Sequence, residues 1–144
     1  MFYRHCASIL TSTGANIIWF MNGISLDHTG NVTPVSNLEW AVRETADFDG
    51  DGKADILWRR TTGNGVILWL MDGATLVQNK QLPGIPSSDW DVSQVGDYNG
   101  DSDLDILWRN SATGGDIIWF MNGAGLGNVA NTTAVSPTSG WAIR

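Results

Sequence analysis

A seven-residue tract recurs three times along the chain and constrains its fold more than any other feature. Ile-Ile-Trp-Phe-Met-Asn-Gly stands at residues 17–23, a close variant follows at residues 67–73, and residues 117–123 repeat the first tract without change. The spacing is 50 residues both times. Repetition at a fixed period of this length is typical of chains that stack copies of one small structural unit.

Two further sets of residues keep the same period. Trp40 and Trp90 lie 50 residues apart, and Trp141 follows 51 residues later. Residues 55–59 read Asp-Ile-Leu-Trp-Arg, and residues 105–109 repeat them without change. Because separate tracts share one register, the chain is predicted to consist of tandem copies of a single unit.

Each copy is predicted to be all-β. In the third copy, strands are expected at residues 90–95, 106–109 and 117–121, with a fourth somewhere in 126–135. Asn-Gly or Asp-Gly pairs at 22–23, 72–73 and 122–123 indicate hairpin turns. Four strands in a period of about 50 residues make one blade of a β-propeller, so three blades per chain are predicted.

The phase of the repeat predicts how the blades are divided. A single domain over residues 1–144 is expected to hold a partial blade at 1–36, completed by a strand at 140–144, and blades at 38–86 and 88–136. Three blades are too few to close a ring, and an open arc exposes an edge strand. Two alternatives follow: a strand-exchanged homodimer with six blades, or a piece of a longer propeller.

An aspartate-rich loop at residues 47–55 separates the first two strands of the second blade. Carboxylates fall at loop positions 1, 3, 5 and 9, which are Asp47, Asp49, Asp51 and Asp55, and the carbonyl of Lys53 can add a further oxygen. Hard cations such as Ca²⁺ take about six to eight oxygen ligands from a flexible loop. The sequence therefore predicts a metal site here.

A second loop at residues 97–105 repeats the pattern in the third blade. Oxygen ligands are predicted from Asp97, Asn99, Asp101 and Asp105, with the carbonyl of Asp103. Ser102 stands where the first loop has a glycine, so a positive φ at this position would be strained. The N-terminal copy lacks the loop, and two calcium ions per chain are predicted.

The ion is inferred from ligand chemistry. All-oxygen ligation disfavours zinc and copper, and magnesium prefers tight octahedral sites that keep several waters. Neither loop is an EF-hand, because position 12 is Trp58 or Trp108 instead of a bidentate Glu. The alternative is a solvated Asp-Gly turn without an ion. Calcium is expected to be structural and to fix the hairpin between two strands.

Charge and composition exclude several classes of protein. The net charge is -7, and eight of the fifteen acidic residues lie in the two loops, so nucleic acid is not expected as a partner. No apolar run is long enough to span a membrane. The N-terminus is a poor secretory signal, which leaves a cytoplasmic protein or a piece of a larger exported one.

The aspartate loops followed by Ile-Leu-Trp, on a 50-residue repeat, resemble the FG-GAP/VCBS repeats of integrin-like β-propellers. The resemblance covers nearly the whole chain. It implies calcium in the blade hairpins, an extracellular or cell-surface location, and roles in adhesion or in binding carbohydrate or protein. Propellers of this family usually have seven blades in one chain, so three repeats depart from the pattern.

Tryptophan and arginine supply the remaining candidates for a site. Trp19, Trp69 and Trp119 are expected to pack in the core, and Trp40, Trp90 and Trp141 at blade junctions. As speculative carbohydrate or protein contacts, the sequence offers the following residues: Trp58, Arg59, Trp108 and Arg109. His5 and His28 are expected to face solvent, with no nucleophile motif beside them.

The sequence therefore predicts a calcium-binding recognition or adhesion module that is not an enzyme. The alternative is a self-assembling structural module whose only ligand is calcium. An acid–base pair for glycoside hydrolysis is not expected, because the carboxylates are grouped at metal-ligand spacing.

Overall fold

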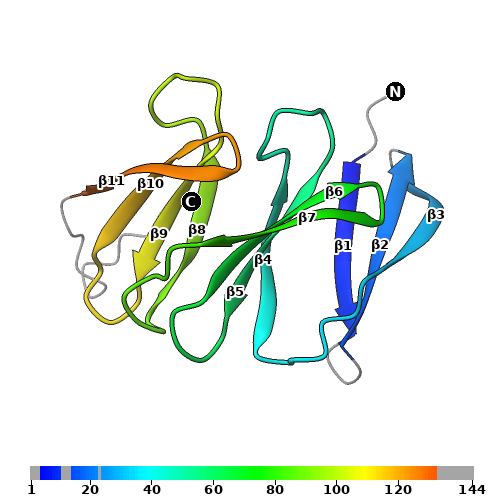
Figure 1. The fold of residues 1–144 in the computed structure, drawn as a ribbon, viewed down its shortest axis with the longest axis horizontal. Coiled ribbons are helices and arrows are strands. Elements are labelled where there is room, and N and C mark those ends of the chain that lie inside the picture. Colours follow the sequence, from blue (N-terminus) through cyan, green and yellow to red (C-terminus); the bar gives the residue numbers. More distant parts are fainter. Residues whose placement is uncertain (1–3, 11–13, 23, 133–144) are drawn as a thin grey trace.

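The computed structural model describes residues 4–10, 14–22 and 24–132, the first of these stretches by its backbone. All of its regular structure there is β-strand, which confirms the predicted all-β class (Figure 1). The strands are β1 (Arg4–Leu10), β2 (Ala15–Asn22), β3 (Ser25–Val32), β4 (Trp40–Ala46), β5 (Asp55–Arg60), β6 (Val66–Asp72), β7 (Thr75–Leu82), β8 (Trp90–Gly96), β9 (Asp105–Asn110), β10 (Asp116–Asn122) and β11 (Gly125–Asn131).

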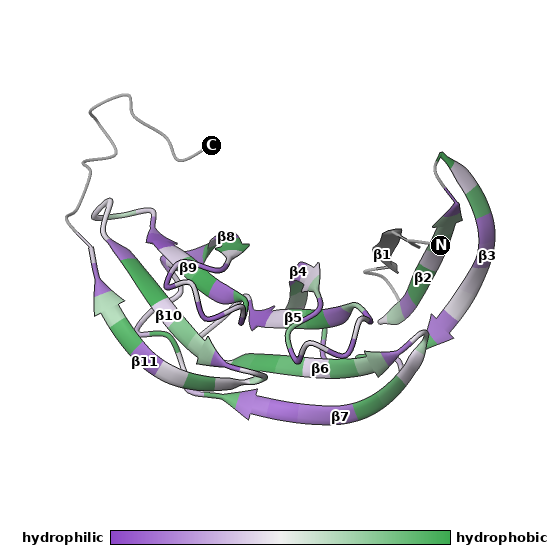
Figure 2. Cartoon of the chain, turned by 90° about the horizontal axis from the view of Figure 1, so that it is seen from above, coloured by the Kyte–Doolittle hydropathy of each residue, from purple (hydrophilic) through white to green (hydrophobic). Residues whose placement is uncertain are grey.

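The strands form three antiparallel sheets whose order follows the chain. The first sheet is β1-β2-β3, the second is β4-β5-β6-β7, and the third is β8-β9-β10-β11. Figure 2 shows the sheets side by side along an arc, with β1, β4 and β8 on its concave side and β3, β7 and β11 on its convex side. This is the arrangement of successive propeller blades. The strand predicted at 140–144 lies outside the described residues.

Tight turns between the third and fourth strands of each blade set the register. Asp72 pairs with Thr75, and Asn122 pairs with Gly125, so each turn has two central residues. Gly73 has a φ of 61° and Gly123 a φ of 53°. Only the first central residue is left-handed, as in a type II′ turn, so the glycine itself opens the turn.

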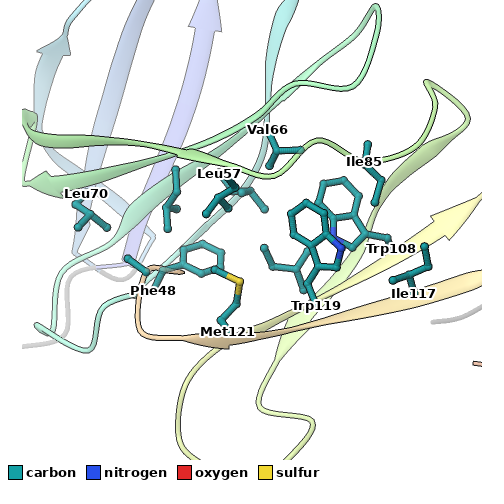
Figure 3. Packing of buried hydrophobic residues seen from close by; sticks show 13 residues of the cluster. Phe48, Leu57, Val66, Leu70, Ile85, Trp108, Ile117, Trp119 and Met121 are labelled. Carbon is teal, nitrogen blue, oxygen red and sulfur yellow. The ribbon is translucent and has the colours of Figure 1, made fainter. Parts of the chain in front are cut away.

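The hydrophobic core lies between the sheets, because both faces of a strand in the middle sheet are apolar. Along β5 and β6, Ile56, Trp58 and Trp69 pack towards the first sheet. Leu57 and Leu68 alternate with them and pack towards the third sheet (Figure 3). A strand with both faces buried reads as a continuous apolar run, and the tract at 66–71 does so.

Trp19 departs from its prediction. Trp69 and Trp119 are buried, as expected, but Trp19 at the same repeat position is exposed. Trp69 lies on the face of the second sheet that the first sheet covers, and no described sheet covers the corresponding face of the first. Trp40 and Trp90 are partly buried and pack against the two interfaces between sheets, which confirms their place at blade junctions.

Candidate metal centre

The first aspartate loop joins β4 to β5 and is organised around Asp47. One carboxylate oxygen of Asp47 accepts hydrogen bonds from the backbone N–H groups of Gly50 at 2.8 Å and Asp51 at 3.0 Å. The other oxygen accepts one from Gly52 at 2.8 Å. Gly50 and Gly52 have φ values of 78° and 85°, which an L side chain rarely adopts. The glycines therefore let the loop curl around this carboxylate.

Three of the predicted ligands meet in this loop. One carboxylate oxygen from each of Asp47, Asp49 and Asp55 lies within 4.8 Å of the other two. Asp51 is not part of this trio, and its carboxylate lies 3.3 Å from Nζ of Lys53. Oxygens this close repel one another unless a cation or a proton lies among them.

Asp55 has a second role that sequence patterns did not reveal. It is buried at the start of β5, and its two oxygens accept backbone hydrogen bonds from Phe48 and Met71, both at 2.9 Å. Burial, with smaller contributions from Asp49 and Asp51, raises the pKa of Asp55 to about 6, although the two hydrogen bonds act in the opposite direction. A divalent cation would favour the charged form instead.

The second loop, between β8 and β9, has nearly the same hydrogen bonds. Asp97 accepts from Gly100 at 2.6 Å and from Ser102 at 3.0 Å, and these bonds lower the pKa of Asp97. Asp105 accepts from Tyr98 and Met121, both at 2.9 Å. Ser102 has a φ of 76°, so the strain that the sequence attached to a positive φ at this position is present. No other non-glycine residue in the described stretches has a positive φ.

Position 3 differs between the loops. The amide nitrogen of Asn99 donates to the carboxylate of Asp101 at 2.8 Å, so these two predicted ligands already contact each other. A trio of acidic side chains comparable to that of the first loop is not formed here in the part of the chain that the structure describes.

Through its seventh position, each loop also contacts the turn between the third and fourth strands, which lies at the same end of the blade. Nζ of Lys53 lies 3.4 Å from the carboxylate of Asp72, and the pKa of Lys53 is raised by Asp51 and Asp72. In the third sheet, Asp103 accepts a hydrogen bond from Gly123 at 2.8 Å. The prediction gave these two positions a carbonyl role only. The sequence does hold a sign of this contact. The second blade has Lys53 and Asp72 where the third has Asp103 and Asn122, so the two contacting positions differ together between the repeats.

The predicted aromatic contacts for a ligand are wrong. Trp58 and Trp108 are buried between sheets, and each ring packs at 4.9 Å from its blade partner, Trp69 or Trp119. Neither can offer a ring face to a carbohydrate. In the sequence these tryptophans stand just before polar turns, but in the fold they belong to the core between sheets.

The two arginines are also held within the fold. Arg59 is buried, and its guanidinium donates to the carbonyl oxygens of Gly63 at 3.0 Å and Ser87 at 2.9 Å. Arg109 forms an ion pair with Asp116 at 2.8 Å. His28 is exposed, as expected, with its ring stacked on Phe20. The position of His5 is described by its backbone only.

The donor set of the first loop fits a hard cation. All of the side chains in the trio are carboxylates, and the nearby ammonium of Lys53 pairs with Asp51 and Asp72 instead of the trio. A loop of this kind supplies oxygen ligands and flexibility, which Ca²⁺ requires.

A fold made of antiparallel four-stranded sheets on a 50-residue repeat, with aspartate loops at matching places, defines a blade-repeat protein. The model of the FG-GAP-like repeat family matches residues 47–108 of the chain. This confirms the family that the loops predicted. The match runs from the first loop to β9 and so includes most of both repeated sites.

Searches among curated proteins and among solved structures returned no match. FG-GAP-like repeats often bind calcium, are typically extracellular and are generally non-enzymatic. No helix in the described part of the chain is long and apolar enough to cross a membrane.

Proposed function

We propose that the chain is a calcium-stabilised propeller module that presents a recognition surface to a carbohydrate or a protein, without catalytic activity. The observation that supports this most directly is the convergence of Asp47, Asp49 and Asp55 within 4.8 Å. Asp51 and the carbonyl of Lys53 are the further oxygens that the first loop can bring to the ion.

The second calcium ion is proposed to bind between β8 and β9. Asp97, Asn99 and Asp105 are the counterparts of the trio, and Asp101 and the carbonyl of Asp103 are the additional donors. Asp55 and Asp105 accept the same pair of backbone hydrogen bonds in the two loops, which supports a calcium-binding role for both loops. Calcium would stabilise the hairpin between the first two strands of each blade.

Calcium removal tests this proposal. Because a ligand that binds only the folded state stabilises it by mass action, calcium at about 100 times its Kd should add about 2.7 kcal/mol to the free energy of unfolding. Thermal melting with Ca²⁺ and with a chelator should therefore show a higher Tm with Ca²⁺, and isothermal titration should show two sites. A chelator-insensitive Tm would contradict the proposal.

A pair of variants separates ligation from charge. Asp49→Ala removes an exposed carboxylate of the trio, and we expect titration to show one calcium site instead of two. Asp72→Asn removes one exposed negative charge that lies outside the trio. The next repeat has asparagine at this position, so both calcium sites should persist in this variant. Loss of a site in both variants would indicate a general electrostatic effect.

Recognition requires its own test. Binding of the calcium-loaded protein to a glycan array, repeated in chelator, separates a calcium-dependent carbohydrate-binding module from one that binds protein or serves only as structure. Reproducible binding that the chelator abolishes supports carbohydrate recognition. Because Trp58 and Trp108 are buried, substituting them is not a test of ligand contact.

A further inference from the structure

Lys53 carries the positive charge of the first aspartate loop and stands between two carboxylates. Its Nζ lies 3.3 Å from the carboxylate of Asp51, at the fifth loop position, and 3.4 Å from that of Asp72, in the turn between β6 and β7. All three side chains are partly exposed. Because exposed ion pairs contribute little energy each, the ammonium can exchange one of these partners for the other at small cost.

The turn that carries Asp72 is held beside the loop by the backbone. β4, β5, β6 and β7 are antiparallel neighbours in that order, so the loop before β5 and the turn after β6 lie at the same end of the sheet. Met71, next to Asp72, donates its backbone N–H to the carboxylate of Asp55 at 2.9 Å. The fold therefore keeps Asp72 near the loop independently of its ion pair with Lys53.

Both carboxylate oxygens of Asp51 are engaged by Lys53. Oδ1 accepts the backbone N–H of Lys53 at 2.8 Å, and Oδ2 faces Nζ. The other three predicted carboxylate ligands of the loop converge without Asp51. Because calcium takes about six to eight oxygen ligands, the site gains when Asp51 turns an oxygen to the ion. That oxygen is then a poor partner for the ammonium, since two cations at one oxygen repel each other.

The second loop keeps the contact with its turn but has no cation in it. Asp103 stands at the seventh position and accepts the backbone N–H of Gly123 at 2.8 Å. The fifth-position carboxylate, that of Asp101, is held by the neutral amide of Asn99 at 2.8 Å. The two loops thus differ in whether a positively charged side chain occupies the fifth-position ligand.

We propose that Lys53 sets the calcium affinity of the first site, because its ammonium competes with the ion for Asp51, and that Asp72 takes over the ammonium when calcium binds. This inference rests on the proposed calcium-binding function of the loop. Without calcium, the ammonium bridges Asp51 and Asp72. With calcium, Asp51 ligates the ion and the ammonium pairs with Asp72 alone. Calcium binding therefore changes the contact between loop and turn in the second blade only.

The affinity of each site has to be measured separately. The backbone N–H groups of Gly52 and Ser102 donate to Asp47 and Asp97, the first predicted ligand of each loop. Their amide resonances in two-dimensional NMR spectra, followed during titration of the full chain with CaCl₂, give one Kd for each loop. A first loop that does not respond to Ca²⁺ would overturn its proposed calcium function as well as this inference. A first loop that binds Ca²⁺ allows the competition to be tested alone.

Lys53→Met tests the competition. The substitution removes the ammonium but keeps the backbone carbonyl that is a predicted ligand. We expect the Kd of the first site to fall roughly 3-fold to 10-fold and that of the second site to stay unchanged. Lys53→Gln should act in the same direction and serves as a second variant. An unchanged first-site Kd in both variants, with folding verified by circular dichroism, would overturn the proposal.

Lys80→Met is the matched control. Lys80 is the other lysine of the chain and lies on β7, outside the loop and the turn that Lys53 connects. Because its removal changes the net charge by the same amount, it reports the effect of overall charge alone. We expect neither calcium affinity to change. A first-site Kd that falls as much as in Lys53→Met would overturn the specific role of Lys53.

Asp72→Asn tests where the ammonium goes. In the wild-type background the ammonium loses its second partner and stays with Asp51, so the first-site Kd should rise roughly 2-fold to 5-fold while the site is retained. In the Lys53→Met background the same substitution should have a much smaller effect, because there is no ammonium to take over. Such non-additivity indicates direct coupling of the two residues. Equal effects in both backgrounds would show that Asp72 acts only through its charge and would overturn the exchange.

Discussion

At the scale of single residues, the aspartate loops combine two functions that one pattern encodes. Asp47 and Asp49 shape the exposed part of the loop, whereas Asp55 is buried and satisfies two backbone N–H groups. A buried N–H group that loses its acceptor costs about 1–3 kcal/mol. The last aspartate of each loop is therefore a structural residue as well as a candidate ligand.

Asp55→Asn is expected to lower the free energy of unfolding by about 1–3 kcal/mol even in chelator, because the amide NH₂ would face a backbone donor. Asp49→Ala should change the free energy of unfolding in chelator little, since the carboxylate of Asp49 is exposed. Chemical denaturation of both variants in chelator makes the comparison. Equal losses would show that Asp55 acts only through the metal.

The raised pKa of Asp55 predicts a pH dependence of the calcium-free protein. Its pKa is about 6 in the folded state against an ordinary value of 3.8, so folding favours the protonated form. The stabilising contribution is complete below 3.8 and is lost as the pH rises through 6. In chelator, the free energy of unfolding should therefore be higher at pH 5 than at pH 7.5.

Calcium should oppose that trend, because the bound cation favours the charged carboxylate. Asp55→Asn is the matched control. In its calcium-free form, the free energy of unfolding should no longer differ between pH 5 and pH 7.5. Denaturation at both pH values provides the measurement. A wild-type protein whose stability in chelator increases from pH 5 to pH 7.5 would contradict the assignment.

The two loops allow the cost of a left-handed backbone conformation to be compared at one loop position within the same protein. Gly52 and Ser102 occupy the same position with φ values of 85° and 76°. A left-handed conformation costs a non-glycine residue about 1–2 kcal/mol, so Gly52→Ser should destabilise the protein by about that amount. Ser102→Gly should be neutral or stabilising, because relief of strain is offset by a more flexible unfolded chain. Thermal melting of both variants tests whether their effects differ in sign.

At the scale of elements, Arg59 ties β5 to the segment that leads into the next blade. Its guanidinium donates to the carbonyl oxygen of Ser87 at 2.9 Å, and Nε lies 3.4 Å from that of Trp90. The same group reaches Gly63 in the loop after β5. Burial lowers the pKa of Arg59. The hydrogen bonds to these carbonyl oxygens offset part of the cost of desolvating the guanidinium.

Arg59→Met should lower the free energy of unfolding by about 2–4 kcal/mol, because several buried carbonyls lose their donor. Arg59→Lys should not restore stability, since an ammonium cannot span the same acceptors. Arg60→Met is the control, because Arg60 pairs with exposed Glu39 and should contribute much less. Equal losses at positions 59 and 60 in denaturation experiments would contradict this role.

At the scale of the whole molecule, the two interfaces between the three sheets are built in the same way, each from the apolar sides of neighbouring sheets. A repeat unit cannot cover both of its sides alone, so its stability depends on neighbouring units. For this reason Trp19 is 45% exposed whereas Trp69, whose side of the second sheet is covered by the first sheet, is 5% exposed.

The sequence by itself determined the repeat, the strand positions and the loops, because these depend on local signals. Alternating apolar residues define strands, Gly after Asn or Asp opens the turns, and evenly spaced aspartates define the loop. Strand bounds differ from their predictions by a residue or two at most for β8 to β10. Even the strain at Ser102 was readable, since only the backbone of one loop decides it.

Only the tertiary structure decided what each residue of the repeat does. Trp19, Trp69 and Trp119 have the same local sequence, but the sheet next to each one determines its burial. Trp58 and Arg59 looked like a ligand surface until a neighbouring sheet covered them. The pattern likewise could not separate Asp51 from the trio, because the position of Lys53 and of the distant turn at Asp72 decides where that carboxylate lies.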